Sequence, residues 1–324
     1  HRIIAPFIRA QLCAFRRKQG TPMNAAATPA PKFATRFAPS PSGLLHLGHA
    51  YSALFAYRLA QAAEGRFVLR IEDIDLGRCK PEFEDAIIED LAWLGLEWEQ
   101  PVLRQSERLD IYANALKTLE QLGILYPCFC TRSDIAAEIA NAGAAPHLNH
   151  HGPDGPVYPG ICKHLSETER AQRIAAGEPH ALRLDMEGAM KKAGPLTWHD
   201  RTRGEQIAEP DIFGDIVLAR KDVATSYHLA VTVDDAAQGV TLVTRGDDLL
   251  PATHIHRLLQ ALLDLDVPEW HHTVLLTNNK GGRLAKRDKA FTLRAMREAG
   301  TDPEDLWAMS IRQIARQATA TDGI

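Results

Sequence analysis

Two histidines, His46 and His49, lie three residues apart where a short apolar run gives way to a helical pattern. The run from 33 to 37 reads as a strand that prolines end because they lack an N–H donor, and apolar residues then recur at helical spacing from 50 to 60. A tight loop at a helix start presents free backbone N–H groups and the positive end of a helix dipole, which suits a phosphate. The pattern alone fits a nucleotide site and, equally well, a structural turn with two surface histidines.

A second strand is predicted from 66 to 73, and it ends in two acids, Glu72 and Asp73. Strand, helix and strand at this spacing form a βαβ unit, which implies a parallel sheet with a right-handed crossover. Ligands of such sheets collect at the carboxyl ends of the strands, so we expect Glu72 and the histidine loop to share one crevice. A solvated turn is the alternative for the two acids.

These residues resemble a known family. Residues 46–49 resemble the HIGH signature of class I aminoacyl-tRNA synthetases, with Leu47 in place of isoleucine, and residues 36–43 resemble the glutamyl branch of that class. The resemblance implies a Rossmann-like domain that binds ATP with Mg²⁺ and activates L-glutamate. The residues that it assigns to ATP near the first strand are Ser42, Gly43, His46, Gly48 and His49.

A basic, glycine-rich segment from 278 to 288 follows a strand predicted at 273–276. Such a loop at a strand end suits a phosphate clamp, whereas a basic surface hairpin would be the better interpretation if it stood alone. Paired with the histidine loop, residues 283–287 resemble the KMSKS loop of class I synthetases, and Lys286 alone keeps the consensus type. The resemblance therefore implies that Lys286 joins His46 and His49 in catalysis and binds ATP.

A crevice for a dicarboxylic amino acid needs fixed cations, and the planar fork of arginine matches a carboxylate. The candidates are Arg36 and Arg245, one for each carboxylate, with Arg36 favoured for the side-chain one. Arg245 lies at the carboxyl end of a buried strand predicted in the run 240–248. An exposed surface charge is the alternative for a lone arginine. The resemblance implies that Glu72 holds the amino group and that Tyr227 donates its hydroxyl. The full glutamate-binding set that it implies is Arg36, Phe37, Ala38, Pro39, Ser40, Glu72, Tyr227 and Arg245.

Three cysteines and a tyrosine form a second constellation. Cys128 and Cys130 are followed by Tyr158 and Cys162, a pattern consistent with a tetrahedral zinc site that lacks one ligand, or with three buried free cysteines. On the residues alone the fourth ligand stays open among Tyr158, His147, His150, His151 and His164. The resemblance implies one structural Zn²⁺ held by Cys128, Cys130, Tyr158 and Cys162.

Composition excludes several protein classes. The 324 residues carry a net charge of −4, five cysteines and no run of about 18 apolar residues, so neither a disulfide scaffold nor a membrane span is expected. The first 32 residues are basic and contain no acid; they resemble a transit peptide, but a poorly ordered extension with a possible true start at Met23 is the better interpretation. We expect a cytoplasmic monomer that does not bind membranes.

The predicted fold class is α/β: a Rossmann-like parallel sheet, an inserted α+β zinc-bearing subdomain and a short helical C-terminal segment. Further strands are predicted at 181–186 and 216–219, and helices at 81–94, 106–122 with Ser106 as cap, 166–176, 254–265, 291–298 and 305–317. The expected divisions are an extension 1–32, catalytic halves 33–126 and 206–270, an insertion 127–205, and the KMSKS-type loop with C-terminal helices 271–324.

About 37 residues follow the basic loop, which is too few for the helical anticodon-binding domain of the resembled glutamyl-tRNA synthetases. The resemblance therefore points to a truncated branch of ligases that activate glutamate as glutamyl-adenylate without tRNA. They then transfer it to queuosine in the anticodon loop of tRNA(Asp). The alternatives are an enzyme that charges a tRNA 3′ end and a non-catalytic zinc-bearing RNA-binding module.

Overall fold

The computed structural model describes residues 32–141, 151–276 and 292–321. Its first half holds the two predicted parallel strands, β1 (Ala34–Phe37) and β2 (Arg66–Ile71), and a third that was not predicted, β3 (Glu99–Arg104), in that order. The α2 helix (Leu47–Ala62) makes the crossover from β1 to β2. The predicted βαβ unit is confirmed.

The second half adds β11 (Leu242–Gly246), which pairs in parallel with β12 (Glu269–Thr273), and β12 pairs in parallel with β8 (Thr197–Asp200). The β9 strand (Gly204–Ile207) lies antiparallel to β8 at the edge. The two halves meet where the N–H of Thr241 donates to the carbonyl of Ala34 at 3.0 Å, so β11 starts beside the start of β1. The carboxyl ends of β1 and β11 therefore border one crevice, the place where doubly wound sheets bind ligands.

The last parallel strand is β12, and the strand predicted at 273–276 was wrong in position. The observed strand starts about four residues earlier than predicted, because Trp270, His271 and His272 are the residues buried in the sheet. Two consecutive histidines do not read as a buried strand, whereas Val274 to Leu276 is apolar in sequence and misled the prediction.

An antiparallel sheet forms the other end of the molecule. It contains β4 (Leu125–Cys128), β7 (Ala181–Leu184) and β10 (Val217–Ala219), in the order β10-β7-β4. A short hairpin of β5 (His151–Gly152) and β6 (Gly155–Pro156) lies beside it, with α5 (Arg132–Asn141), a 3₁₀ turn η4 (Ile161–His164) and α6 (Glu167–Ala175). The predicted insertion thus contains β7 of this sheet and β8 of the parallel one.

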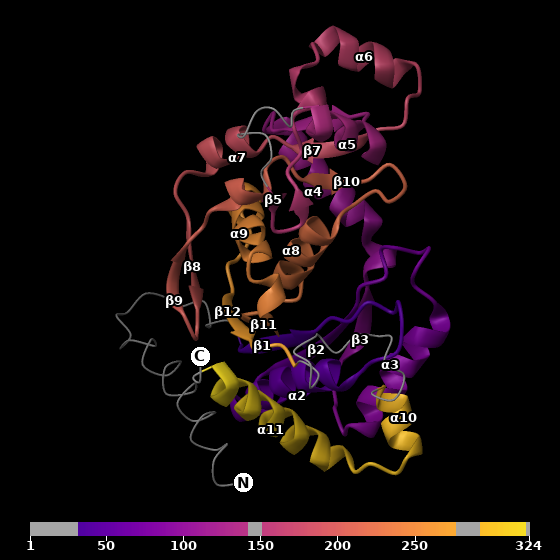
Figure 1. Cartoon of the computed structure of the whole chain (residues 1–324), viewed down its shortest axis with the longest axis vertical. Helices are drawn as coiled ribbons and strands as arrows, with labels where there is room; N and C mark the ends of the chain where they lie inside the picture. Colours follow the sequence, from indigo (N-terminus) through magenta and orange to yellow (C-terminus); the bar gives the residue numbers. More distant parts are fainter. Residues whose placement is uncertain (1–31, 142–150, 277–291, 322–324) are drawn as a thin grey trace, which may run out of the picture.

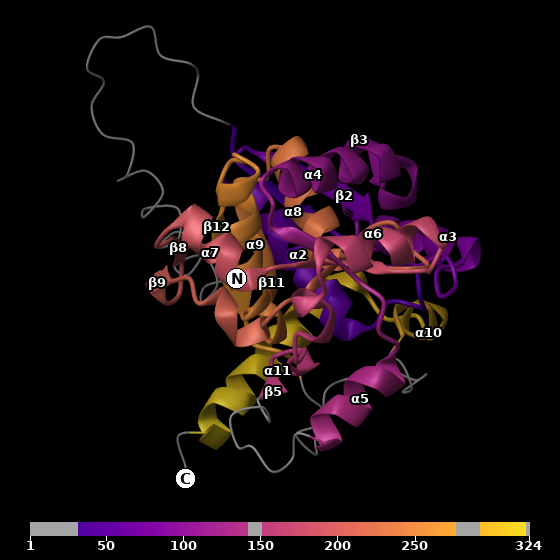
Figure 2. The same cartoon turned by 90° about the horizontal axis from the view of Figure 1, so that it is seen from above.

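Helices fill the space between the sheets and cover their outer faces. These are α3 (Pro81–Trp93), η1 (Gln105–Arg108), α4 (Leu109–Gln121), α7 (Met186–Ala193), η5 (Pro210–Phe213), α8 (Tyr227–Ala237), η6 (Asp247–Leu249), α9 (Ala252–Leu262), α10 (Leu293–Glu298) and α11 (Pro303–Thr321). Figure 1 shows α8 and α9 between the two sheets and α11 beneath α2. In Figure 2, α10 lies against α3, where Arg297 pairs with Glu89 at 2.8 Å.

Two predicted caps had different outcomes. Ser166 and Glu169 form the predicted capping box of α6. Ser106 does not cap a helix, because its N–H and hydroxyl both donate to Asp73, at 2.8 and 2.6 Å. The partner is 33 residues away, so local sequence could not reveal it.

Two hydrophobic clusters hold the architecture together. One surrounds α2 and includes Phe55, Leu69 and Trp307; the other joins α4, α8 and α9 and includes Leu119, Leu229 and Leu259. Within the part of the chain that the structure describes, no helix is long and apolar enough to cross a membrane.

Candidate active site

The start of α2 is capped by histidines rather than by a hydroxyl. The N–H of Gly48 donates to His46 Nδ1 at 3.1 Å, and the N–H of His46 donates to His49 Nδ1 at 3.1 Å. The two rings stack with centroids 3.8 Å apart. Because both Nδ1 atoms accept, a neutral ring carries its proton on Nε2. Two imidazole N–H donors therefore accompany the positive end of the helix dipole.

Gly48 is needed for this arrangement. A Cβ at position 48 would lie 3.0 Å from Cε1 and 3.2 Å from Nδ1 of His46, which is closer than ordinary contact. Ser42 and Gly43 lie half-buried in the bend between β1 and α2. The loop that the sequence predicts as a nucleotide site thus leads directly into the α2 helix.

Lys286 lies outside the described residues, which stop at 276 and resume at 292. Where the chain resumes, Thr292 forms an antiparallel bridge with His46, and the N–H of Leu293 donates to the carbonyl of Leu45 at 2.9 Å. The segment after the basic loop is thus attached to the start of α2.

Arg36 reaches from β1 toward α8 and β11. Its Nε donates to Asp235 Oδ1 at 3.1 Å and its Nη1 donates to the carbonyl of Thr244 at 3.0 Å. Arg36 and Asp235 are both 6% exposed, so the ion pair is buried. Arg36 therefore links the two halves of the parallel sheet at the switch point.

Glu72 is fixed by a buried arginine that the sequence reading did not assign. Arg70, which is fully buried, donates to Glu72 Oε1 at 3.1 Å, to Asp235 Oδ1 at 2.8 Å and to Gln238 Oε1 at 2.9 Å. Burial raises the pKa of the Glu72 carboxyl, while the charges of Arg70 and Arg36 oppose that shift. The Glu72 carboxylate is thus held in position by Arg70.

Arg245 has a different set of partners. Its Nε donates to His272 Nε2 at 3.1 Å, its Nη2 donates to Thr253 Oγ1 at 2.6 Å, and its Nη1 lies 3.1 Å from His256 Nδ1. Behind the site, Asp200 Oδ2 lies 2.7 Å from His272 Nδ1, which places the proton of His272 on that atom. Neutral acceptors therefore hold the Arg245 guanidinium, and its buried charge is not cancelled by a directly bonded carboxylate among the described residues.

A cavity of about 320 Å³ is lined by Ser40, Glu72 and Tyr227 together with Gln105, Arg78 and Arg220; Arg36 and Arg245 are not among its lining residues. Tyr227 is the first residue of α8. Burial raises the pKa of its hydroxyl, the charges of Arg245 and Arg36 oppose the shift, and Glu72 adds to it. Three of the predicted glutamate-binding residues thus share the cavity, and Arg36 and Arg245 lie near enough for their charges to act on Tyr227. Of the others, Phe37 and Pro39 are buried and Ala38 is half-buried, whereas Ser40 is exposed.

Sequence reasoning missed Arg70, Asp235, His256 and His272. A weak signal existed for Asp235, since two adjacent acids within an apolar helical run are unusual inside a core. The histidines carried no such signal, because nothing local shows that α9 and β12 turn them toward Arg245.

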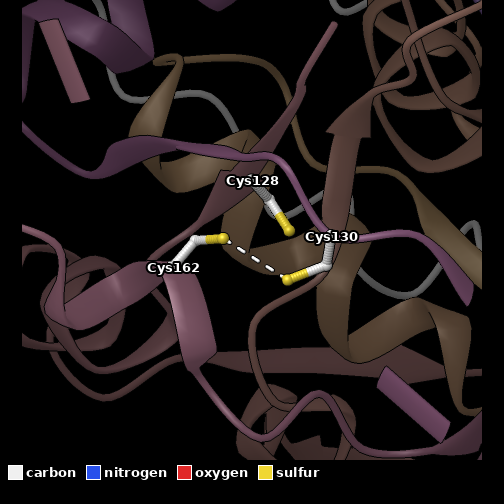
Figure 3. A group of neighbouring side chains, drawn as sticks. All are labelled: Cys128, Cys130 and Cys162. Carbon is white, nitrogen blue, oxygen red and sulfur yellow. Dashed lines mark hydrogen bonds between the residues drawn. The ribbon is translucent and has the colours of Figure 1, made fainter. Parts of the chain in front are cut away.

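The three predicted cysteines converge at the tip of β4, as Figure 3 shows, with Cys162 supplied by η4. Their sulfur atoms all lie within 4.8 Å of one another, and Cys130 and Cys162 are 3.4 Å apart. Tyr158 Oη lies 3.5 Å from the sulfurs of both Cys128 and Cys130.

These donors fit a zinc ion. Tetrahedral Zn²⁺ with Zn–S of about 2.3 Å and Zn–O of about 2.0 Å separates two sulfurs by about 3.8 Å and a sulfur from the oxygen by about 3.5 Å. Of the other predicted ligands, His147 and His150 lie outside the described residues. His151 and His164 are described, and neither belongs to the cluster of possible metal ligands that the three cysteines form.

Comparisons with known proteins give one consistent result. A family model described as "tRNA synthetases class I (E and Q), catalytic domain" matches residues 32–321. The "Glutamyl-Q tRNA(Asp) synthetase" of Rhodobacter capsulatus is 49% identical over 278 residues, which cover 84% of this chain and 97% of that protein. The "Glutamate--tRNA ligase" of Aquifex aeolicus is 39% identical, and the match covers 85% of this chain but 56% of that protein.

Among solved structures, a glutamate tRNA ligase from Elizabethkingia meningosepticum, in complex with its amino acid, superposes with a TM-score of 0.67 at 31% identity. The match covers 79% of this chain and 52% of that one, so the chain spans about half the length of that ligase.

Proposed function

Because the chain belongs to the class I tRNA synthetase family for glutamate and glutamine, we propose that it activates L-glutamate with MgATP and transfers the glutamyl group to queuosine in tRNA(Asp). The observation that carries this proposal is the 49% identity to a glutamyl-Q tRNA(Asp) synthetase over 97% of that protein. The expected acceptor is a hydroxyl of the cyclopentenediol in the anticodon loop.

The amino acid fits the charges of the crevice. We assign the ammonium of glutamate to Glu72, whose carboxylate Arg70 already orients. Arg36 and Arg245 take the two carboxylates, with Arg36 favoured for the side-chain one, and Tyr227 donates its hydroxyl. Arg36 and Arg70 share the carboxylate of Asp235, and Arg245 is a third buried arginine. With Asp235 and Glu72 as the two acids, the cluster keeps a net positive charge, which suits a substrate of net charge −1.

Activation needs no protein nucleophile. An oxygen of the α-carboxylate attacks the α-phosphorus of MgATP in line, a C–O–P linkage forms, and the bond to the pyrophosphate oxygen breaks. We assign the stabilisation of the phosphate charge to Nε2–H of His46 and His49, the start of α2, and Lys286. Thr292, six residues after Lys286, is bridged to His46, and six extended residues span at most about 20 Å. This tether supports the assignment of Lys286.

Transfer completes the reaction. The acceptor hydroxyl attacks the acyl carbon of glutamyl-adenylate, an ester forms, AMP leaves, and the hydroxyl proton is released. We propose that the first step proceeds without tRNA, since no group of the tRNA takes part in it.

We further propose that Cys128, Cys130, Tyr158 and Cys162 hold one Zn²⁺ with a structural role, because its coordination by four protein donors leaves no open position for chemistry. The ion would tie β4 to η4 and so fix the fold of the inserted subdomain, whose limits of 127–205 stay a prediction. The cytoplasmic location and monomeric state also stay predictions.

The decisive experiment charges two anticodon stem-loops of tRNA(Asp) with labelled glutamate, one carrying queuosine and one carrying guanosine. We expect charging of the queuosine form alone. Charging of full-length tRNA(Asp) regardless of queuosine, with no charging of either stem-loop, would favour attachment at the 3′ end and contradict the proposal. Glutamate-dependent ATP–pyrophosphate exchange without tRNA tests the first step and would exclude a non-catalytic RNA-binding module.

A further inference from the structure

A chain of side chains runs from Arg245 to the inserted subdomain. His256 on α9 is 3% exposed; its Nδ1 lies 3.1 Å from Arg245 Nη1 and its Nε2 lies 3.2 Å from His228 Nδ1. His228 on α8 places its Nε2 3.4 Å from Asp154 Oδ2, in the turn between β5 and β6. The aromatic ring of Tyr227 lies beside both histidines, with centroids 5.4 and 5.6 Å away.

Arg245 fixes the direction of every hydrogen bond in this chain. A guanidinium only donates, so His256 Nδ1 must accept. A neutral His256 then carries its proton on Nε2 and donates to His228 Nδ1, and His228 in turn donates from Nε2 to the Asp154 carboxylate. Burial and the charge of Arg245 hold the pKa of His256 well below 6.5, which agrees with a neutral ring.

A proton added at His228 reverses this order. Both ring nitrogens of His228 then donate, so His256 Nε2 must accept and its own proton must move to Nδ1. An N–H of His256 would face an N–H of Arg245, and the hydrogen bond between them is lost. The cost falls on Arg245, because its Nη1 is buried and a donor left without an acceptor is unfavourable.

We propose that His256 and His228 are positioning residues for Arg245, and that proton uptake by His228 weakens the binding of glutamate. The inference rests on the proposed role of Arg245 in glutamate binding. It adds that an acid of the inserted subdomain, Asp154, is connected to the amino-acid pocket through two imidazoles.

The surroundings of His228 allow a proton to enter from one side. His228 borders a cavity of about 260 Å³ that Asp154, Asp215 and Arg183 also line. Asp215 is engaged by the hydroxyl of Tyr126 at 2.6 Å and the N–H of Met186 at 2.8 Å, and the Arg183 side chain donates to the Asp215 carbonyl. Of these groups, only Asp154 has a carboxylate bonded to His228, and His228 lowers the pKa of that carboxyl through the same bond. The Phe213 ring and the buried His256 close the other sides.

The first test removes the acceptor from Arg245. We expect His256→Leu to raise the KM for glutamate in ATP–pyrophosphate exchange by about tenfold, the usual effect of one hydrogen bond to a charged group, with little change in the KM for ATP. His256→Asn keeps an acceptor at the position of Nδ1 and should recover most of that loss. An unchanged KM for glutamate in folded His256→Leu would overturn the proposal.

The second test follows pH. Glutamate itself keeps its charges between about pH 5.5 and pH 8, because its carboxyls and amino group titrate outside that range. We expect its KM to rise as the pH falls in the wild type, and to rise less in His228→Asn, which keeps an acceptor but cannot take up a proton. Ionisation of ATP and pyrophosphate affects both proteins equally. Parallel pH profiles would refute the role of His228.

A third variant separates this inference from the function on which it rests. Arg245→Gln should raise the KM for glutamate at every pH. If Arg245→Gln raises the KM while His256→Leu and His228→Asn behave as wild type, the proposed roles of His256 and His228 are wrong and the glutamate site stands. If Arg245→Gln leaves the KM unchanged, Arg245 does not bind glutamate, and the positioning roles of His256 and His228 are wrong as well.

Discussion

Asp235 is the anionic centre of the buried network, since one of its oxygens accepts from both Arg36 and Arg70. Arg36 comes from β1, Arg70 from β2 and Asp235 from α8, so the three residues join elements of both chain halves. A buried ion pair gives little net stability, but removing one partner leaves uncompensated charge. The network therefore fixes the position of the pocket more than it adds to stability.

We predict that Asp235→Asn lowers the free energy of unfolding by about 3–5 kcal/mol at neutral pH, because two buried guanidinium groups lose their carboxylate. Burial opposes ionisation of Asp235, but the two arginines hold its pKa below the ordinary 3.8. A lowered pKa gives stability that is present above 3.8 and lost as the pH falls through the lower folded value. Urea unfolding should thus show a constant difference from wild type between about pH 5 and pH 8, shrinking below about pH 4. A difference that grew at low pH would contradict this.

Lys286 provides a second prediction for a single residue. Lys286→Ala should reduce glutamate-dependent ATP–pyrophosphate exchange by an amount equivalent to about 3–4 kcal/mol in the barrier, as when one charge-stabilising donor is removed. The thermal midpoint should stay that of the wild type. Exchange at the wild-type rate would show that the phosphate charge is stabilised without this lysine.

At the scale of elements, the start of the α2 helix has both a structural and a proposed catalytic role, because the histidines that cap it are the ones proposed for catalysis. Alanine favours a helix over glycine by about 1 kcal/mol, so Gly48→Ala alone would be expected to stabilise α2. Its Cβ would instead press on the ring of His46, 3.0 Å from Cε1.

We therefore predict that Gly48→Ala keeps the thermal midpoint near that of wild type while kcat for exchange falls by about ten- to a hundredfold, since small displacements of positioned groups are costly. Gly188→Ala is a matched control, because its Cβ would lie 2.9 Å from the carboxylate of Asp185, which caps α7 and pairs with Lys163 rather than with a described residue of the proposed active site. Equal loss of activity in both variants would mean that the effect is only structural.

The elements near the site also show what local sequence can predict. The β1–α2–β2 unit followed from proline positions, helical spacing and a strand ending in acids. The position of β12 did not, because its buried residues include His271 and His272. His272 is bonded to Asp200 and Arg245, and His271 packs against the ring of Phe55, so both gain their place from distant partners. Helix and strand periodicity predicts where apolar side chains face, and it carries no information on buried polar side chains with distant partners.

At the scale of the whole molecule, the proposed glutamate pocket draws on residues that lie more than 200 positions apart. Arg36 contacts the carbonyl of Thr244 across 208 positions, and the resemblance to a family had assigned Arg36 and the neighbouring Arg245 to one pocket. What neither spacing nor resemblance supplied is the network behind them: Arg70, Asp235 and His256 follow only from the way α8 and α9 pack between the two sheets (Figure 1).

The cysteine cluster lies in the antiparallel end, and the proposed glutamate pocket lies at the crevice of the parallel sheet, so loss of the metal should affect the two reaction steps unequally. Zinc that joins Cys128 to Cys162 closes a loop of about 35 residues, which stabilises by about 4 kcal/mol in the chain-entropy model.

We predict that the purified protein holds about one zinc per chain, and that a chelator or Cys162→Ser lowers the thermal midpoint by at least about 5 °C, since each kcal/mol shifts it by roughly 2–4 °C at this size. Exchange without tRNA should survive better than transfer to queuosine, because Cys162 does not line the glutamate cavity. Lys163→Ala is the matched control. Lys163 follows Cys162 in sequence but pairs with Asp185 and is not a proposed zinc ligand, so this change should leave the zinc content as it is. Metal-free protein with an unchanged midpoint after chelation would show that the cysteines are buried thiols and nothing more.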